Sequence, residues 1–163
     1  MFFVLALLLT LTLALPAPAA AGDADLWATI NICDTEAYPN VLGVRASMPG
    51  NRTRQKMWMR FRATYYDRAT ETWHRIPGDS QSPWVEVGGA RPRARQAGRR
   101  FMIEPPLPTS THVVRSVVKF QWRRRMTGEV VRRERRVTLA GHPTGSYGDP
   151  YDYSAGLCEI RYP

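Results

Sequence analysis

Cysteine is scarce in this chain of 163 residues, because only Cys33 and Cys158 are present. A disulfide-dense miniprotein is therefore excluded, and two isolated cysteines do not supply the four closely spaced ligands of a structural zinc site. Cysteines of exported proteins are usually oxidised, and these two lie near opposite ends of the sequence that follows residue 21. We therefore predict a Cys33–Cys158 disulfide, with two buried free thiols as the alternative.

Catalytic motifs are also lacking. His74, His112 and His142 are widely separated, so no two of them have the spacing that places metal ligands on one helical face. Gly78-Asp79-Ser80 is similar to the nucleophile block of a family of secreted lipases and esterases. That family is α/β and carries the block just after its first strand, whereas here the block follows Pro77 in mid-chain and is interpreted as a turn.

The acidic residues show no ligand pattern either. Asp149, Asp152 and Glu159 lie in or beside a late loop, but they lack the spacing of a calcium-binding loop and are interpreted as solvated acids. No pair of carboxylates is singled out as a glycosidase pair. We predict no catalytic residue, no metal site and no cofactor.

Long apolar runs are limited to the start of the chain. An apolar stretch from Phe2 to Leu15 is followed by prolines and small residues, so residues 1–21 are predicted to be a secretory signal, although no basic residue precedes the stretch. The run is broken at Pro16, short of the roughly 20 residues that a membrane span needs, which makes a retained anchor the weaker alternative. We expect a secreted or cell-envelope protein whose residues 22–163 form one domain without a transmembrane segment.

Helical periodicity is almost absent from the rest of the sequence, which alternates apolar and polar residues with a period of two. This pattern indicates strands with one buried face. In the first predicted strand, Leu26, Ala28, Ile30 and Ile32 alternate with polar neighbours, so Cys33 is expected on the face opposite these aliphatic side chains. The predicted strands cover residues 26–33, 42–48, 56–67, 73–76, 84–87, 99–104, 112–124, 129–139 and 157–160.

Seven to nine short strands separated by frequent turns predict an all-β fold, a two-sheet antiparallel β-sandwich with one disulfide. In strand rhythm and tryptophan content, most of residues 22–163 resembles immunoglobulin-like or fibronectin type III-like secreted domains. An immunoglobulin domain joins its central strands by a disulfide beside a tryptophan, whereas Cys33 and Cys158 bracket nearly the whole domain. The resemblance implies a binding or scaffolding role by analogy.

Arginine is abundant and clustered. The formal net charge is +9, and seven arginines fall on one predicted hairpin, with Arg115 and Lys119 on its incoming strand. We call residues 123–136 the arginine hairpin. Its candidate anion-binding residues are Arg123, Arg124, Arg125, Arg132, Arg133, Arg135 and Arg136. Neighbouring strand residues point to opposite faces, so the seven cannot share one surface, and the register that sorts them is left open.

A structural explanation competes with anion binding. Charged residues protect an edge strand from pairing with other chains, and Lys56 and Lys119 are the only lysines, which indicates a general bias toward arginine. A second cluster, between Arg91 and Arg100, would extend the surface if it lies beside the first. The aromatic residues Trp27, Trp58, Trp73, Trp84, Tyr65 and Tyr66 are expected in the core, with a sugar-binding face as the alternative.

The predicted function is that of a secreted, non-enzymatic module that binds an extracellular or cell-envelope partner, either a protein or an anionic polymer held by the arginine hairpin. A small secreted hydrolase with an unmarked active site, or a purely structural domain, are the alternatives. Sequence-specific nucleic-acid binding is not expected, because no predicted helix could enter a groove.

Overall fold

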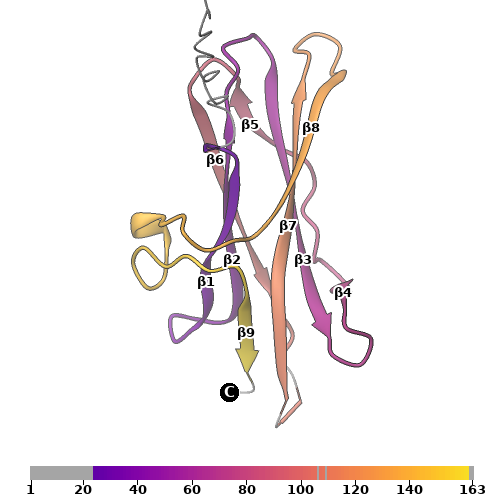
Figure 1. Ribbon diagram of the computed structural model, residues 1–163, viewed down its shortest axis with the longest axis vertical. Coiled ribbons are helices and arrows are strands. Elements are labelled where there is room, and N and C mark those ends of the chain that lie inside the picture. The colour runs from indigo at the N-terminus through magenta and orange to yellow at the C-terminus, as the bar shows by residue number, and fades with distance from the viewer. Residues whose placement is uncertain (1–23, 106, 109, 162–163) are drawn as a thin grey trace, which may run out of the picture.

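The computed structural model describes residues 24–105, 107–108 and 110–161, and the strands within them form two facing antiparallel sheets (Figure 1). The strands are β1 (Trp27–Thr35), β2 (Tyr38–Pro49), β3 (Lys56–Asp67), β4 (Thr72–Arg75), β5 (Val85–Gly89), β6 (Ala94–Met102), β7 (Thr111–Arg123), β8 (Val130–Val137) and β9 (Cys158–Arg161). A single 3-10 turn, η1 (Gly145–Tyr147), lies between β8 and β9. The predicted all-β sandwich is confirmed, whereas the predicted signal at residues 1–21 lies outside the described residues.

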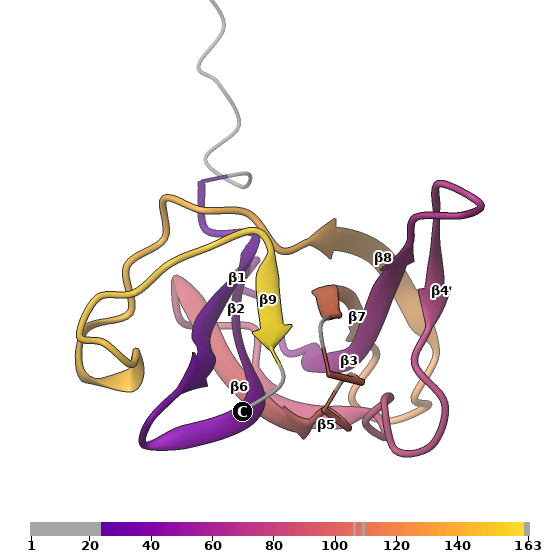
Figure 2. The ribbon, with the colours of Figure 1, turned by 90° about the horizontal axis from the view of Figure 1, so that it is seen from below.

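The two sheets differ in width. The smaller sheet has the order β1-β2-β6. In the larger, six-stranded sheet, β3 and β7 are the central pair, with β4 and β5 on the free side of β3 and β8 and β9 on the free side of β7. Figure 2 shows the two sheets facing each other, with the long connection between β8 and β9 on the side of β1 away from the larger sheet.

Alternation along β3 builds the core. Met57, Met59 and Phe61 are at most 1% exposed and point toward the smaller sheet, while their neighbours point outward. Burying each such side chain contributes about 1.5–3 kcal/mol relative to leaving it exposed. The indole Nε1 of Trp122, opposite Met57 on β7, donates to the Pro49 carbonyl at 3.1 Å and so ties the two sheets together.

One expectation about β1 is wrong, because the strand contains a β-bulge. Ile30 pairs with Val44, but Ile32 pairs with Gly43, so the bulge reverses the alternation. Ile32 therefore lies on the outer face of the sheet, above Gly43. A Cβ at Gly43 would lie only 2.7 Å from the Cβ of Ile32. Cys33 turns toward the core side, and not away from the aliphatic face as the strict alternation predicted.

The strand β6 begins at Ala94, and not at residue 99 as the sequence pattern suggested. Its register with β2 places Arg95 opposite Met48 and Arg99 opposite Val44, on the face that points toward the core at the edge of the sheet. Inward-pointing charges on an edge strand discourage pairing with other chains. Because these arginines occupy positions where apolar residues are expected, local sequence did not mark the first half of the strand.

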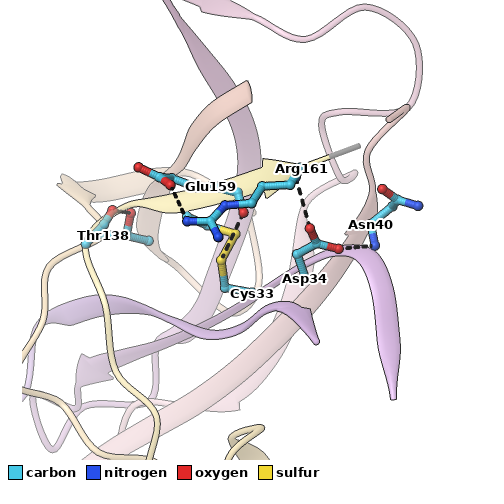
Figure 3. The surroundings of a disulfide bond; sticks show 8 residues. Cys33, Asp34, Asn40, Thr138, Glu159 and Arg161 are labelled. Atoms are coloured by element: carbon cyan, nitrogen blue, oxygen red, sulfur yellow. Dashed lines mark hydrogen bonds and ion pairs between the residues drawn. A yellow bond between two sulfur atoms is a disulfide. The ribbon is translucent and has the colours of Figure 1, made fainter. Parts of the chain in front are cut away.

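The predicted disulfide is confirmed. Cys33 of β1 and Cys158 of β9 are bonded, with a Cα–Cα distance of 5.5 Å, and the bond joins an edge of the smaller sheet to an edge of the larger one. Nearby, the Asp34 carboxylate accepts from the backbone N–H groups of Asn40 at 2.7 Å and Arg161 at 3.0 Å (Figure 3). A cross-link between residues 125 positions apart lowers the entropy of the unfolded chain, worth about 4–5 kcal/mol in the loop-closure model.

Candidate anion-binding face

The outward side chains of the six-stranded sheet form one surface, which we call the outer basic face. Arg60 on β3, Lys119 on β7 and Arg135 on β8 lie opposite one another in a single row across three strands. Outward positions above and below this row are also rich in cations and aromatic rings. The cations are Arg60, Arg62, Arg75, Arg115, Lys119, Arg123, Arg133 and Arg135, and the rings are Trp58, Tyr66, Trp73 and Trp84.

Carboxylates do not neutralise this face. Within the described part of the chain, none of its eight cations forms an ion pair with Asp or Glu. Arg62 donates instead to the amide oxygen of Gln81 at 2.7 Å, and Arg123 to that of Gln121 at 2.9 Å. Lys56, which lies opposite Arg123 in another outward position, is instead paired with Glu86 at 2.9 Å. The excess positive charge of the face therefore rests on the eight cations named above.

Tryptophan rings hold several of the guanidinium groups. The Cζ of Arg60 lies 4.6 Å from the centre of the Trp84 ring, and the Cζ of Arg123 lies 4.5 Å from Trp58 and 5.2 Å from Trp84. A guanidinium stacked on a ring is held in a fixed plane, while its N–H edges stay available for two-point contacts with phosphate, sulfate or carboxylate groups. The stacking therefore orients these cations in advance.

A second stack extends the face toward β4. Arg115 on β7 lies 3.8 Å from the centre of the Trp73 ring, and Trp73 packs against Tyr66 with ring centres 5.3 Å apart. Burial lowers the pKa of the Arg115 guanidinium, and the charge of Arg135 lowers it further. The effect agrees with the register, which brings cations of β7 and β8 next to one another.

Three donors on the face are shielded from solvent without an acceptor. They are Nε1 of Trp58, Nε of Arg60 and Nε of Arg115, none of which has a hydrogen-bond partner within the described residues. Of the three residues, Arg60 lines a depression of about 580 Å³ that lies between Trp84 and the β7–β8 pair. Oxygen atoms of a bound anion would supply acceptors of the kind that these N–H groups require.

The register of β8 divides the arginine hairpin. Arg133 lies opposite Gln121 and Arg135 opposite Lys119, so both point outward with Arg123. The sequence alone left open which of the alternating residues of β8 point outward, and the pairing of β8 with β7 decides this. Three of the seven candidate arginines therefore lie on the outer basic face.

The other four lie elsewhere. Arg132 and Arg136 are on the opposite side of β8 and flank Glu134, with nitrogen–oxygen distances of 3.0 and 3.5 Å to its carboxylate. Arg124 forms an ion pair at 2.7 Å within the β7–β8 turn. Arg125 is exposed at the same turn and faces the β5–β6 connection.

The candidate list missed the contributions of β3 and β4. Arg60, Arg62 and Arg75 share the face with the hairpin because β3 pairs with both β7 and β4. The sequence did carry a signal, since Arg60 and Arg62 alternate with buried residues along β3. That signal marks an outward face, but only the sheet order shows which other cations join it.

The turn containing Ser80 has a structural explanation. The Ser80 hydroxyl donates to the Ile76 carbonyl, and the side chain is only 5% exposed. Its backbone carbonyl accepts from the Ala63 N–H at 2.7 Å, which closes the gap between β4 and β5 along the edge of β3. Among the described residues, no three His, Cys, Asp or Glu side chains are grouped as metal ligands would be.

Comparison with family models, with curated protein sequences and with solved structures finds no match for this chain. Within the part of the chain that the structure describes, no helix has the length and apolar character needed to cross a membrane.

Proposed function

We propose that the protein is a secreted, non-enzymatic module that binds an anionic polymer of the extracellular space or cell envelope on its outer basic face. The observation that carries the proposal is the set of eight outward cations without a carboxylate partner in the described chain. A polymer with repeated negative charges can contact several of them at once and release counterions as it binds. The disulfide supports export, since such bonds persist in oxidising compartments.

Edge protection does not account for the cations on the central strands of this face. Arg60 and Lys119 lie on β3 and β7, the two central strands of the sheet, where the backbone is already paired on both sides. By contrast, Arg95, Arg99 and Arg132 point inward from the edge strands β6 and β8, as edge protection requires. The two explanations therefore apply to different arginines of the same chain.

The test compares two variants that remove the same charge from opposite sides of one strand. Arg133→Gln/Arg135→Gln alters the outer basic face, and Arg132→Gln/Arg136→Gln alters the other side of β8. Each purified protein is eluted from a dextran sulfate matrix over a salt series. We expect the first variant to elute at clearly lower salt, with a slope of log retention against log salt reduced by about one to two.

The matched variant decides how this result is interpreted. Arg132→Gln/Arg136→Gln should elute close to the unaltered protein, although its net charge falls by the same amount. Equal shifts for both variants would mean that retention follows net charge alone, and the proposed face would be wrong. Circular dichroism of each variant verifies that the sandwich is intact before elution is compared.

A further inference from the structure

A cavity of about 640 Å³ lies at one end of the sandwich, and none of the eight cations of the outer basic face lines it. Three connections meet there, between β2 and β3, between β5 and β6, and between β7 and β8, all at the upper end of the molecule in Figure 1. They contribute Arg54, Arg91 and Arg125, respectively, and Arg95 is added from the start of β6. The second arginine cluster of the sequence and the turn of the arginine hairpin therefore come together at this cavity, which we call the end cavity.

The end cavity is strongly positive. Its only lining carboxylate is Glu86, which is paired with Lys56 at 2.9 Å. Within the described residues, Arg54, Arg91 and Arg125 have no ion pair, and Arg95 has only a 3.5 Å hydrogen bond to a backbone carbonyl. Four arginines thus line the cavity without a carboxylate partner in the described part of the chain.

Arg93 differs from Arg91 and Arg95 in having a carboxylate partner. It lies between Arg91 and Arg95 in the sequence but does not line the cavity, and its Nε is 3.0 Å from the Asp25 carboxylate. The chain therefore neutralises the arginine that points elsewhere and leaves its two neighbours, which line the cavity, without a carboxylate.

The backbone around the cavity is held in place. The N–H of Gly50 donates to the Arg93 carbonyl at 2.7 Å, and the Ala90 carbonyl accepts from both Asn51 and Arg52 at 2.9 Å. A Cβ at Gly50 would lie 1.8 Å from the Pro92 carbonyl oxygen, so only glycine permits this close approach. The β2–β3 and β5–β6 connections thus form one frame, which cannot separate to relieve the repulsion between its arginines.

Glycine also positions Arg95. Gly88 has a φ of +118°, and a Cβ there would lie 3.2 Å from the Arg95 Nε. The Arg95 side chain can therefore lie directly over the backbone of β5. A Cβ at position 88 would require the Arg95 side chain to shift by a few tenths of an ångström.

We propose that the end cavity binds a compact tetrahedral oxyanion with two negative charges, a phosphate or sulfate group. Guanidinium groups form two-point hydrogen bonds to such anions, and several arginines can converge on one small group only in a concave site. The group is either a free ion or the terminal ester of a larger molecule. This site is separate from the outer basic face and does not require that face to bind a polymer.

Calorimetry and NMR titration with inorganic phosphate test the site. We expect saturable binding, with shifts of backbone amides concentrated at residues 50–56, 86–95 and 124–128. Arg91→Gln/Arg95→Gln should weaken binding by about tenfold or more, because it removes charge-assisted hydrogen bonds, and a tenfold change corresponds to about 1.4 kcal/mol. Arg91→Lys/Arg95→Lys keeps the charge but loses the planar fork, so it should bind with intermediate affinity.

A control from the same strand separates the site from net charge. Arg99→Gln/Arg100→Gln removes two arginines from β6 that do not line the end cavity, and it should bind phosphate within about twofold of the unaltered protein. Equal weakening in this control, or phosphate shifts that never saturate, would overturn the site.

Further probes identify the form of the ligand. Glycerol 3-phosphate that binds as tightly as inorganic phosphate supports a site for terminal esters, and binding of inorganic phosphate alone supports a site for the free ion. Dimethyl phosphate, with one charge, should bind much more weakly than either.

The Arg133→Gln/Arg135→Gln variant keeps the two proposals distinguishable. It should lose retention on dextran sulfate but keep its phosphate affinity. If phosphate does not bind the unaltered protein while this variant still elutes from dextran sulfate at lower salt, only the end cavity is overturned.

Discussion

The outer faces of the two sheets differ in whether a connecting segment of the chain covers them. Residues 139–157 lie against the smaller sheet, where the Thr29 hydroxyl is 2.7 Å from that of Ser154 and Trp27 stacks on His142 with ring centres 4.9 Å apart. Backbone hydrogen bonds between Ile30 and Ala155 fix this cover in both directions. On the larger sheet, the contacts of the outer basic face come from its own strands and from the 76–84 connection along its edge.

This difference shows where polar outward residues serve the fold and where they are available to a partner. Polar groups of β1 are satisfied by the chain's own loop, so their replacement should cost stability. Cations of β3, β7 and β8 are stacked but not neutralised, so their replacement should cost binding. Three predictions test this division, from the largest expected effect to the smallest.

Removal of the disulfide should have the largest effect on the covered side, because Cys158 immediately follows the covering segment. We expect Cys33→Ser/Cys158→Ser to lower the free energy of unfolding by about 2–5 kcal/mol, measured by urea denaturation. At temperatures where this variant is still folded, its retention on dextran sulfate should match that of the unaltered protein. A stability loss below about 1 kcal/mol would show that noncovalent contacts alone hold the cover.

A pair of single substitutions should separate stability from binding. Asn31 is 7% exposed, and its side-chain amide donates to the Tyr147 carbonyl in the cover. Asn31→Ala should lower the free energy of unfolding by about 0.5–1.5 kcal/mol, because the hydrogen bond to the Tyr147 carbonyl is lost. Lys119→Ala, at the centre of the outer basic face, should change it by no more than about 0.5 kcal/mol.

Binding should follow the reverse order. Lys119→Ala should elute from dextran sulfate at lower salt than the unaltered protein, whereas Asn31→Ala should elute unchanged. If Lys119→Ala destabilises the fold as much as Asn31→Ala does, the outer basic face is part of the structural core of the sheet, and the division between the two faces is wrong.

The smallest effect should be a pH dependence from the covered face. Burial lowers the pKa of His142, so between its folded and unfolded pKa values the unfolded chain binds more protons. Stability should therefore decrease as the pH falls from about 7.5 to about 5, because the unfolded pKa is near 6.5. The melting temperature of His142→Gln should fall less over this pH range than that of the unaltered protein. An identical pH dependence in both proteins would exclude His142 as a source.

Local pattern was sufficient for much of the fold. The alternation of residues 56–67 predicted β3 within its observed bounds, and the presence of only two cysteines in a chain expected to be exported predicted the disulfide. It failed where a tertiary contact changed the period. The bulge at Asn31 reverses the faces of Ile32 and Cys33, and the first half of β6 is a strand because β2 pairs with it, although its inward positions are arginines.

Composition and alternation by themselves determined that this protein is all-β, is cross-linked once and carries its excess charge on arginine. Only the tertiary structure decided which arginines act together. Alternation assigns neighbouring residues to opposite faces, but the register decides which face points to the core and which to solvent. A surface such as that of Arg60, Lys119 and Arg135 exists only because three strands lie side by side. The end cavity likewise depends on loops remote in sequence, which meet because the strands they connect end at the same end of the sandwich.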